Sequence, residues 1–186
     1  MTRAAFLDWD GHEDGRYEFD GVRPVPMARE ALNHSRIVGN IAFALHTRLR
    51  GTGMFALGPE VGLATTGSAV RYPDVLVAQS GQIGTSKLAT GAVAVFEVVS
   101  PTSSRTDRIT KVAEYRAVPA IRRYVIVEGT SVALRAHHSQ SANADWTVTL
   151  LVVGEVLALP ELGIEVPLAE IYEGTGVPET APDDDH

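Results

Sequence analysis

The stretch Ala92-Val93-Ala94-Val95-Phe96-Glu97-Val98-Val99-Ser100-Pro101 decides the architecture of this chain. Its first eight residues are apolar except for Glu97, and four of them are valine. A short, apolar, β-branched run of this kind predicts a strand that is buried on both faces. Ser100-Pro101 ends the strand, because proline has no N–H for the hydrogen-bond ladder.

Extended and helical patterns alternate on both sides of this strand. Before it, we expect a hairpin of 16–19 and 22–27 around Asp20-Gly21, a helix over about 31–50, and strands over 54–64 and 70–78. After it, we expect a helix over about 105–117, strands over 121–128 and 131–138, a hairpin of 146–153 and 156–159, and a short helix over 168–172. In the helix over about 105–117, we expect the side chains of Ile109, Val112, Ala113 and Arg116 to lie on one side. This order predicts an α/β (α+β) fold, a mixed sheet flanked by helices.

Length and composition predict one folded domain. The chain has 186 residues, of which 45% are hydrophobic, so it can bury a core. We expect a flexible segment over 1–15, the domain over 16–173, and a disordered acidic tail over 174–186. There is no cysteine, which excludes disulfides and cysteine-ligated zinc. No apolar run reaches the ~20 residues of a membrane span, and no signal peptide is evident, so a cytoplasmic protein is expected.

The charge is unevenly distributed along the chain. The net charge is −7, but nine acidic residues and no Lys or Arg lie from Glu155 to His186. Residues 1–154 therefore carry a net charge of +2. Six basic and two acidic residues lie from Arg105 to Arg123. This mildly basic body can approach phosphates, although dedicated DNA-binding domains are usually far more basic.

Two carboxylates occupy apolar surroundings that normally exclude them. Glu97 interrupts the buried strand, and Asp74 lies within the apolar run over 70–78. Burying an ionised carboxylate without a partner costs several kcal/mol, so a compensating cation is needed. If the two strands are neighbours, Asp74 and Glu97 can share one Mg²⁺ ion. Two alternatives remain: Glu97 pairs with Arg71 or Arg108, and Asp74 caps a turn begun by Pro73.

Other polar residues are weaker candidates for chemistry. His34 shares the inward face of its helix with Val38, where a lone histidine is more often structural than functional. Glu60, in the strand before Asp74, is a further ligand or a surface residue, and Glu18 in the first hairpin is similarly ambiguous. There is no Gly-x-Ser-x-Gly turn for a serine hydrolase and no phosphate-binding glycine-rich loop.

A set of spaced motifs resembles a bacterial family of candidate restriction endonucleases in the PD-(D/E)XK nuclease superfamily. The resemblance covers about residues 16–173. It rests on Tyr17-Glu18 with Gly21, His34-Ser35-Arg36-Ile37-Val38, Pro73-Asp74, Glu97-Val98-Val99-Ser100-Pro101, the series Asp107, Lys111 and Tyr115, and Leu157-x-Leu159-Pro160-x-Leu162-Gly163. Each motif is weak alone, and their order and spacing together carry the resemblance.

The resemblance implies roles for these residues. Asp74 and Glu97 would bind Mg²⁺ or Mn²⁺, with the backbone carbonyl of Val98 as a third ligand. The signature lysine of the superfamily should stand where this chain has Val99, so Lys111 is its expected substitute. His34, Glu60 and Tyr115 are possible additional site residues, and Tyr115 is expected mainly to pack, with its hydroxyl near Glu97. Arg105 and Arg108 are candidate nucleic-acid contacts.

Three functions follow from this reading. The first is a metal-dependent endonuclease that hydrolyses DNA phosphodiester bonds. A homodimer would suit it, since cutting both strands favours two-fold symmetry, and nothing in the residues demands one. The second is a nuclease fold without catalysis, which binds nucleic acid or a protein partner. The third is a scaffold whose buried acids form ion pairs only, with Lys111 paired to Asp107 on the helix surface. The sequence leaves all three open.

Overall fold

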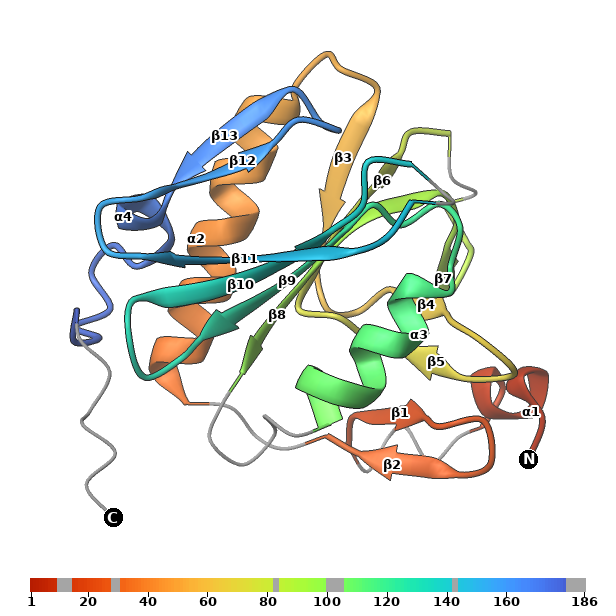
Figure 1. Ribbon diagram of the computed structural model, residues 1–186. Helices are drawn as coiled ribbons and strands as arrows, with labels where there is room; N and C mark the ends of the chain where they lie inside the picture. Colours follow the sequence, from red (N-terminus) through yellow and green to blue (C-terminus); the bar gives the residue numbers. More distant parts are fainter. Residues whose placement is uncertain (10–14, 28–30, 82–83, 100–105, 142–143, 180–186) are drawn as a thin grey trace.

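A six-stranded mixed sheet forms the centre of the computed structural model, with helices on both faces (Figure 1). The structure describes residues 1–9, 15–27, 31–81, 84–99, 106–141 and 144–179, and of 106–108 the backbone alone. The strands of this sheet are β3 (Met54–Leu57), β6 (Val75–Gln79), β8 (Ala92–Val99), β9 (Arg123–Glu128), β10 (Ala133–His138) and β11 (Thr147–Val152). They lie in the order β11-β10-β9-β8-β6-β3, and β8 and β9 are its parallel pair. The predicted fold, a mixed sheet flanked by helices, is confirmed.

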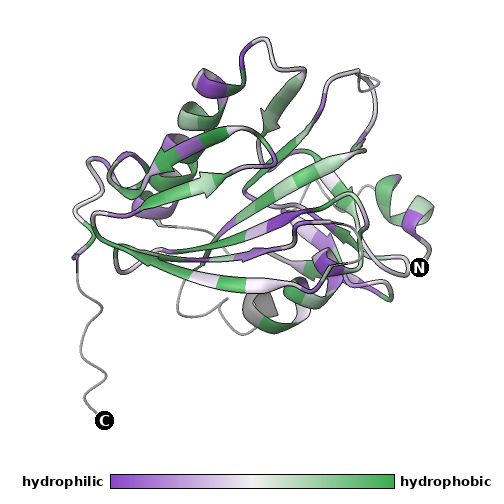
Figure 2. Cartoon of the chain, turned by 45° about the horizontal axis from the view of Figure 1, so that its top comes forward, coloured by the Kyte–Doolittle hydropathy of each residue, from purple (hydrophilic) through white to green (hydrophobic). Residues whose placement is uncertain are grey.

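Strand β8 has the burial that its sequence predicts. Ala94, Phe96 and Val98 pack on one face of the sheet, in one hydrophobic cluster, and Val95 and Val99 pack on the other, in a second cluster. Figure 2 shows apolar residues along the central strands. Because both faces are covered, a polar side chain in this strand has to find its partners within the protein.

Helix α2 (Leu32–Leu49) covers one face of the sheet and presents Ile37, Ile41 and Leu45 to it. On the other face, the π-helix η2 (Thr106–Lys111) and helix α3 (Val112–Arg116) connect the parallel strands β8 and β9. The expected sidedness of this second helix is wrong, because Ile109 is 62% exposed whereas Lys111, Val112 and Tyr115 are buried. A π-turn holds more residues than an α-turn, so spacing by 3.6 residues misplaces the buried side.

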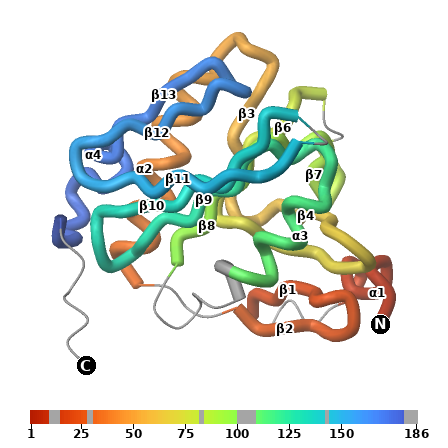
Figure 3. Tube along the Cα trace, viewed as in Figure 1, coloured from red at the N-terminus to blue at the C-terminus, as the bar shows by residue number. Residues whose placement is uncertain are grey.

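A second sheet lies beside the first. It contains β1 (Tyr17–Phe19), β2 (Pro24–Pro26), β4 (Gly62–Ala64), β5 (Val70–Arg71) and β7 (Leu88–Ala89), in the order β2-β1-β5-β4-β7. The predicted hairpin is β1–β2, with β2 at the sheet edge, and Figures 1 and 3 show it next to α3.

The expected strands over 54–64 and 70–78 are each divided between the two sheets. The first breaks between β3 and β4, and the second breaks at Tyr72-Pro73-Asp74, between β5 and β6. Pro73 lacks the N–H that would continue a ladder. The chain therefore changes sheet at this point, immediately before the residue that the sequence singles out.

The N-terminus is more ordered than a flexible segment over 1–15 would be. Residues Arg3–Leu7 form α1, and the fully buried Phe6 stacks on Phe19 at 5.1 Å between ring centroids. The Arg3 guanidinium donates hydrogen bonds to carbonyls of the 65–69 loop. Burial of one aromatic ring fixes a helix too short to be stable alone. Residues 10–14 lie outside the described part.

The predicted hairpin of 146–153 and 156–159 is wrong. Strand β11 pairs with β10, whereas β12 (Val156–Leu159) pairs with β13 (Ile164–Pro167). Leu157 and Leu159 are buried against the α2 side of the core with the predicted short helix α4 (Leu168–Ile171). Leu157 and Leu159 of β12 thus join the core on the α2 side of the sheet, a placement that local turn signals do not encode.

The segment expected to be a disordered tail begins as part of the fold. Thr175 is 8% exposed, and the Val132 N–H donates to the Pro178 carbonyl at 3.0 Å. Residues 180–186, with their acidic run, lie outside the described residues. In the described ranges, no helix has both the length and the hydropathy of a membrane span.

Candidate active site at the end of the central sheet

Asp74 stands at the bend where the chain passes from β5 to β6, and it is 8% exposed. Its Oδ2 atom accepts a hydrogen bond from the Val98 N–H at 2.8 Å and lies 3.2 Å from His34 Nε2. His34 comes from the first turn of α2. The expectation that Asp74 lies within a strand is thus corrected: it precedes β6, where its side chain can turn across the sheet end.

Glu97 lies on the strand next to Asp74. The antiparallel register of β6 and β8 pairs Val75 with Phe96, so its continuation by one residue sets Asp74 opposite Glu97. Glu97 is 6% exposed. Its Oε1 atom accepts hydrogen bonds from Lys111 Nζ at 2.9 Å and from the Tyr115 hydroxyl at 3.0 Å. The predicted proximity of the Tyr115 hydroxyl to Glu97 is present, in a side chain that also packs in the core.

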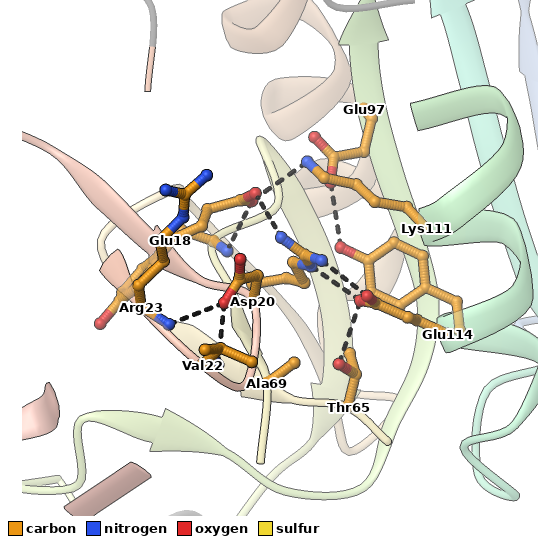
Figure 4. A network of polar contacts seen from close by, with 12 residues as sticks. Glu18, Asp20, Val22, Arg23, Thr65, Ala69, Glu97, Lys111 and Glu114 are labelled. Atoms are coloured by element: carbon orange, nitrogen blue, oxygen red, sulfur yellow. Dashed lines mark hydrogen bonds and ion pairs between the residues drawn. The ribbon is translucent and has the colours of Figure 1, made fainter. Parts of the chain in front are cut away.

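Lys111 is enclosed by two carboxylates and is 6% exposed. Its Nζ atom lies 2.9 Å from Glu97 Oε1 and 3.0 Å from Glu18 Oε1 (Figure 4). It is therefore not the surface lysine that pairing with Asp107 would require. Val99, at the signature position, is 2% exposed within the core. A lysine from the end of η2 thus brings its amine to the glutamate of β8.

Glu18 connects this lysine to a further chain of charges. Arg71 Nη1 lies 3.1 Å from Glu18 Oε2, and Arg71 also binds Glu114 through Nε at 2.7 Å and Nη2 at 2.6 Å. The Thr65 hydroxyl donates to Glu114 at 3.2 Å. Burial alone lowers the pKa of Arg71, but its hydrogen bonds to Glu114 and the charge of Glu18 raise it overall. Arg71 is therefore a permanent cation in the cluster.

Tyr115 is a neutral hydrogen-bond donor here. Complete burial raises the pKa of its phenol well above the ordinary value, and the charge of Glu97 raises it further. A phenol with a raised pKa keeps its proton at neutral pH. Tyr115 therefore fixes one oxygen of Glu97 without adding charge.

The cluster holds more negative than positive charge. Among the side chains that the structure describes there, the charged groups are the carboxylates Glu18, Asp74, Glu97 and Glu114 and the cations Arg71 and Lys111. Counting His34 as neutral, the cluster carries two more negative than positive charges, an excess that one divalent cation would neutralise. Carboxylate oxygens are the ligands that Mg²⁺ prefers.

The donor geometry is not that of a ready-made metal cluster. In the described part of the chain, no three His, Asp or Glu side chains converge closely enough to hold an ion. Glu97 is instead turned toward Lys111 and Tyr115. A cation that used this carboxylate would have to share it with the lysine.

Several predicted site residues do not join the cluster. Glu60 is exposed in the turn after β3, so its assignment to a strand is wrong. Arg105 and the side chain of Arg108 lie outside the described residues. The Val98 N–H is directed to Asp74, and in an extended strand the carbonyl of the same residue points to the same side. A metal-binding role for the Val98 carbonyl remains a prediction.

Sequence reasoning left Glu18 ambiguous, offered Arg71 only as a partner of Glu97, and did not foresee Glu114. In the structure Arg71 pairs with Glu18 and Glu114 instead. Arg71 gave a usable signal, since it is a charged residue in an apolar run just before Pro73-Asp74. Glu18 gave a signal only as part of the Tyr17-Glu18 motif, and Glu114 gave none, because the partners of both are distant in sequence. The β1 hairpin brings Glu18 beside η2 and α3, as Figure 4 shows.

Comparison with known proteins agrees with this fold. A family model described as "Uma2: Putative restriction endonuclease" matches residues 3–169. The "Uncharacterized protein slr1290" of Synechocystis is 25% identical over 177 residues, covering 94% of this chain and 92% of its own. "Uncharacterized protein sll1609" of the same organism is 24% identical over 156 residues, covering 81% and 87%. The crystal structure of "a putative nuclease belonging to DUF820" from Anabaena variabilis superposes with a TM-score of 0.73 at 14% identity, over 92% of this chain and 97% of that one.

Proposed function

The chain belongs to the Uma2 family of restriction-endonuclease-like proteins, and we propose that it is a divalent-metal-dependent endonuclease that hydrolyses DNA phosphodiester bonds. The observation that carries the proposal is the excess of two negative charges in the buried cluster at the end of the central sheet. Asp74 and Glu97 lie on adjacent paired segments there, and Lys111 adds the amine that the signature lysine would supply.

The cluster fits Mg²⁺ or Mn²⁺ by the chemistry of its donors. Asp74 and Glu97 would hold the ion, with the Val98 carbonyl as a further ligand. When bound, such an ion lowers the pKa of a coordinated water and offsets charge on the scissile phosphate.

The chain's own residues then orient the reaction. His34, 3.2 Å from Asp74, and the Val98 N–H fix the direction of that carboxylate. Lys111 would contact the attacking water or a phosphate oxygen, because its ammonium is buried and aimed at the carboxylates. Hydrolysis adds water across one P–O bond and leaves a phosphate monoester and a hydroxyl group.

The proposal extends to partners. DNA is the proposed substrate, Arg105 and Arg108 its proposed contacts, and the cytoplasm the proposed compartment. Because cutting both strands of a duplex favours two sites related by two-fold symmetry, we propose a homodimer.

Metal binding in the absence of substrate tests the site. We would measure Mn²⁺ binding by calorimetry for the wild type and for Asp74→Asn, which keeps an oxygen that can accept the Val98 N–H. Binding should be lost in the variant, and metal-dependent cleavage of DNA should fall at least about a hundredfold, more than the loss of a supporting group usually causes. Glu165→Gln, on the exposed face of β13, is the matched control. Cleavage that survives in Asp74→Asn would exclude Asp74 from the mechanism.

A second function is favoured by one specific observation. Glu97 is already paired with Lys111, and no three-ligand cluster is formed by the described residues. A nuclease fold that binds nucleic acid without cutting it would keep these ion pairs permanently. It predicts salt-sensitive DNA binding that is unchanged in Asp74→Asn and needs no metal.

A further inference from the structure

A second site lies on the α1 side of the five-stranded sheet. A cavity of about 460 Å³ opens there, and its lining includes the aromatic side chains of Trp9, Tyr17 and Tyr72. Tyr17 and Glu18 are consecutive in β1, so they point to opposite faces of the strand. The cavity therefore lies on the far side of β1 from the Glu18–Lys111 pair, and its volume is that of a small-molecule pocket.

Packing holds these rings in place. Trp9 meets Tyr17 edge to face, with ring centroids 5.1 Å apart and planes at 73°, and Phe6 lies behind it at 6.3 Å. The backbone N–H of Tyr72 donates to Glu18 Oε1 at 3.3 Å, which ties this residue to the charged cluster. The aromatic surfaces are thus set before a ligand arrives, which reduces the entropy lost on binding.

Charged groups of both signs surround the rings. Arg16 and Lys87 line the cavity, as do Asp8 and Glu60. Arg16 donates to the Pro59 carbonyl at 3.1 Å, and Lys87 donates to the Leu7 carbonyl and lies 3.6 Å from Asp8. A ligand with a flat aromatic ring, hydrogen-bond donors and an anionic group complements this lining. A nucleotide has all three, since its base stacks on aromatic rings, its ring N–H or amino groups donate to carboxylates, and its phosphate attracts cations.

The cavity is close to the carboxylates along the chain. Pro73 alone separates Tyr72 from Asp74. Since consecutive Cα atoms are 3.8 Å apart, the Cα atoms of Tyr72 and Asp74 are at most about 7.6 Å apart.

We propose that this cavity binds an unpaired nucleobase. Resting on the proposed function, the inference names the substrate class: a strand with an unpaired or flipped-out nucleotide close to the cut. A base stacked within a duplex cannot enter such a cavity without leaving the stack. The cavity would select single strands, mismatches and ends over intact duplex.

Trp9 gives a direct readout, because the chain contains two tryptophans and the other, Trp146, can be replaced. In full-length Trp146→Phe, without metal, we would follow Trp9 fluorescence during titration with deoxycytidine monophosphate. Deoxyribose 5-phosphate, which lacks the base, is the control ligand. Saturable quenching by the nucleotide alone supports a base site. Equal responses to both ligands, or no response to either, would overturn the proposal.

A pair of variants separates stacking from simple occupancy. Tyr72→Leu removes the aromatic face and should weaken nucleotide binding about tenfold, whereas Tyr72→Phe keeps it and should stay within about twofold. Equal affinity in both variants would exclude Tyr72 from the base site. A single-stranded oligonucleotide should bind more tightly than the same sequence as a blunt duplex, and the reverse order would also contradict the inference.

These outcomes do not depend on catalysis. Nucleotide binding without any metal-dependent cleavage would leave the base site standing and remove the endonuclease function. Cleavage that is equal on paired and unpaired strands, with no fluorescence response, would keep the endonuclease and remove the base site.

Discussion

Two buried ion-pair clusters sit in different parts of this domain and differ in charge balance. Arg123 and Glu161 form a closed pair, with Nε–Oε1 at 2.6 Å and Nη2–Oε2 at 2.9 Å. This two-bond geometry matches one guanidinium to one carboxylate. The Lys111 cluster at the sheet end is larger and retains two negative charges. Burial of charge is common to both, so burial alone does not mark a functional site. The charge imbalance is what distinguishes the cluster at the proposed site.

The cavity beside the balanced Arg123–Glu161 pair is not at the cluster that has the excess negative charge. A cavity of about 660 Å³ lies beside Arg123 and Glu161, with Arg122 and His138 also in its lining, and it does not include the Asp74 carboxylate. A small cation needs ligands and charge rather than volume. We therefore place the proposed chemistry at the charge imbalance and not at the larger hollow.

The largest expected effect comes from breaking the balanced Arg123–Glu161 pair. Arg123→Met should leave Glu161 unpaired and lower the free energy of unfolding by about 3–5 kcal/mol. The double variant Arg123→Met, Glu161→Leu should recover most of that loss, because both charges are then absent. Urea unfolding measures both, and cleavage per folded molecule should be unchanged. Reduced cleavage by the folded double variant would show that this pair has a role beyond stability.

One substitution in the cluster with excess negative charge should have opposite effects on metal binding and on cleavage. Lys111→Met removes a cation from between Glu18 and Glu97, so Mn²⁺ binding should tighten about tenfold while cleavage falls about a hundredfold. Lys87→Met changes the only other lysine and is the control for metal binding. Weaker Mn²⁺ binding in Lys111→Met would mean that the lysine does not compete for Glu97.

The buried histidine His137 should make the free energy of unfolding depend on pH. His137 stacks on Tyr124, with ring centroids 6.0 Å apart, and burial followed by the charges of Arg116 and Arg135 lowers its pKa to about 4. The unfolded chain binds this proton near pH 6.5, so the contribution is present above about 6.5 and is lost as pH falls toward 4. From pH 7 to pH 5 we expect a loss of about 1–2 kcal/mol.

Replacing the ring tests this assignment. His137→Phe keeps an aromatic partner for Tyr124. In urea unfolding at pH 5, 6 and 7, this variant should show a smaller change of the free energy of unfolding with pH than the wild type. If the variant shows the same slope as the wild type, other groups control the acid sensitivity.

The smallest effect concerns the neutral donor of the cluster. Tyr115→Phe removes one hydrogen bond to Glu97 and should cost about 1 kcal/mol of stability, with Lys111 still in place. Cleavage should fall less than tenfold and Mn²⁺ affinity should change little, because no charge is lost. A loss of cleavage as large as that of Asp74→Asn would make the phenol a direct participant.

The carboxylates were predictable from the sequence because of their surroundings. Glu97 in an apolar strand and Asp74 after Pro73 in another are anomalies that any reading of hydropathy exposes. Lys111 was found through the spacing of a family motif, whereas periodicity misjudged which side of its helix is buried. The structure shows that Lys111 is buried and contacts Glu97. Residue spacing could not predict this contact, because Lys111 lies at the end of a π-helix.

The sequence by itself determined the central strand over 92–99, the first hairpin, the long helix and the mixed sheet, because hydrophobic period and turn chemistry act over a few residues. The tertiary structure alone decided that two expected strands divide between sheets and that β12 pairs with β13 instead of β11. It also decided that Glu18, Arg71 and Glu114 complete the cluster. These outcomes depend on which surfaces and charges meet across distant segments. Local patterns carry no record of such partners, so the charge balance of the site could be counted only in the folded chain.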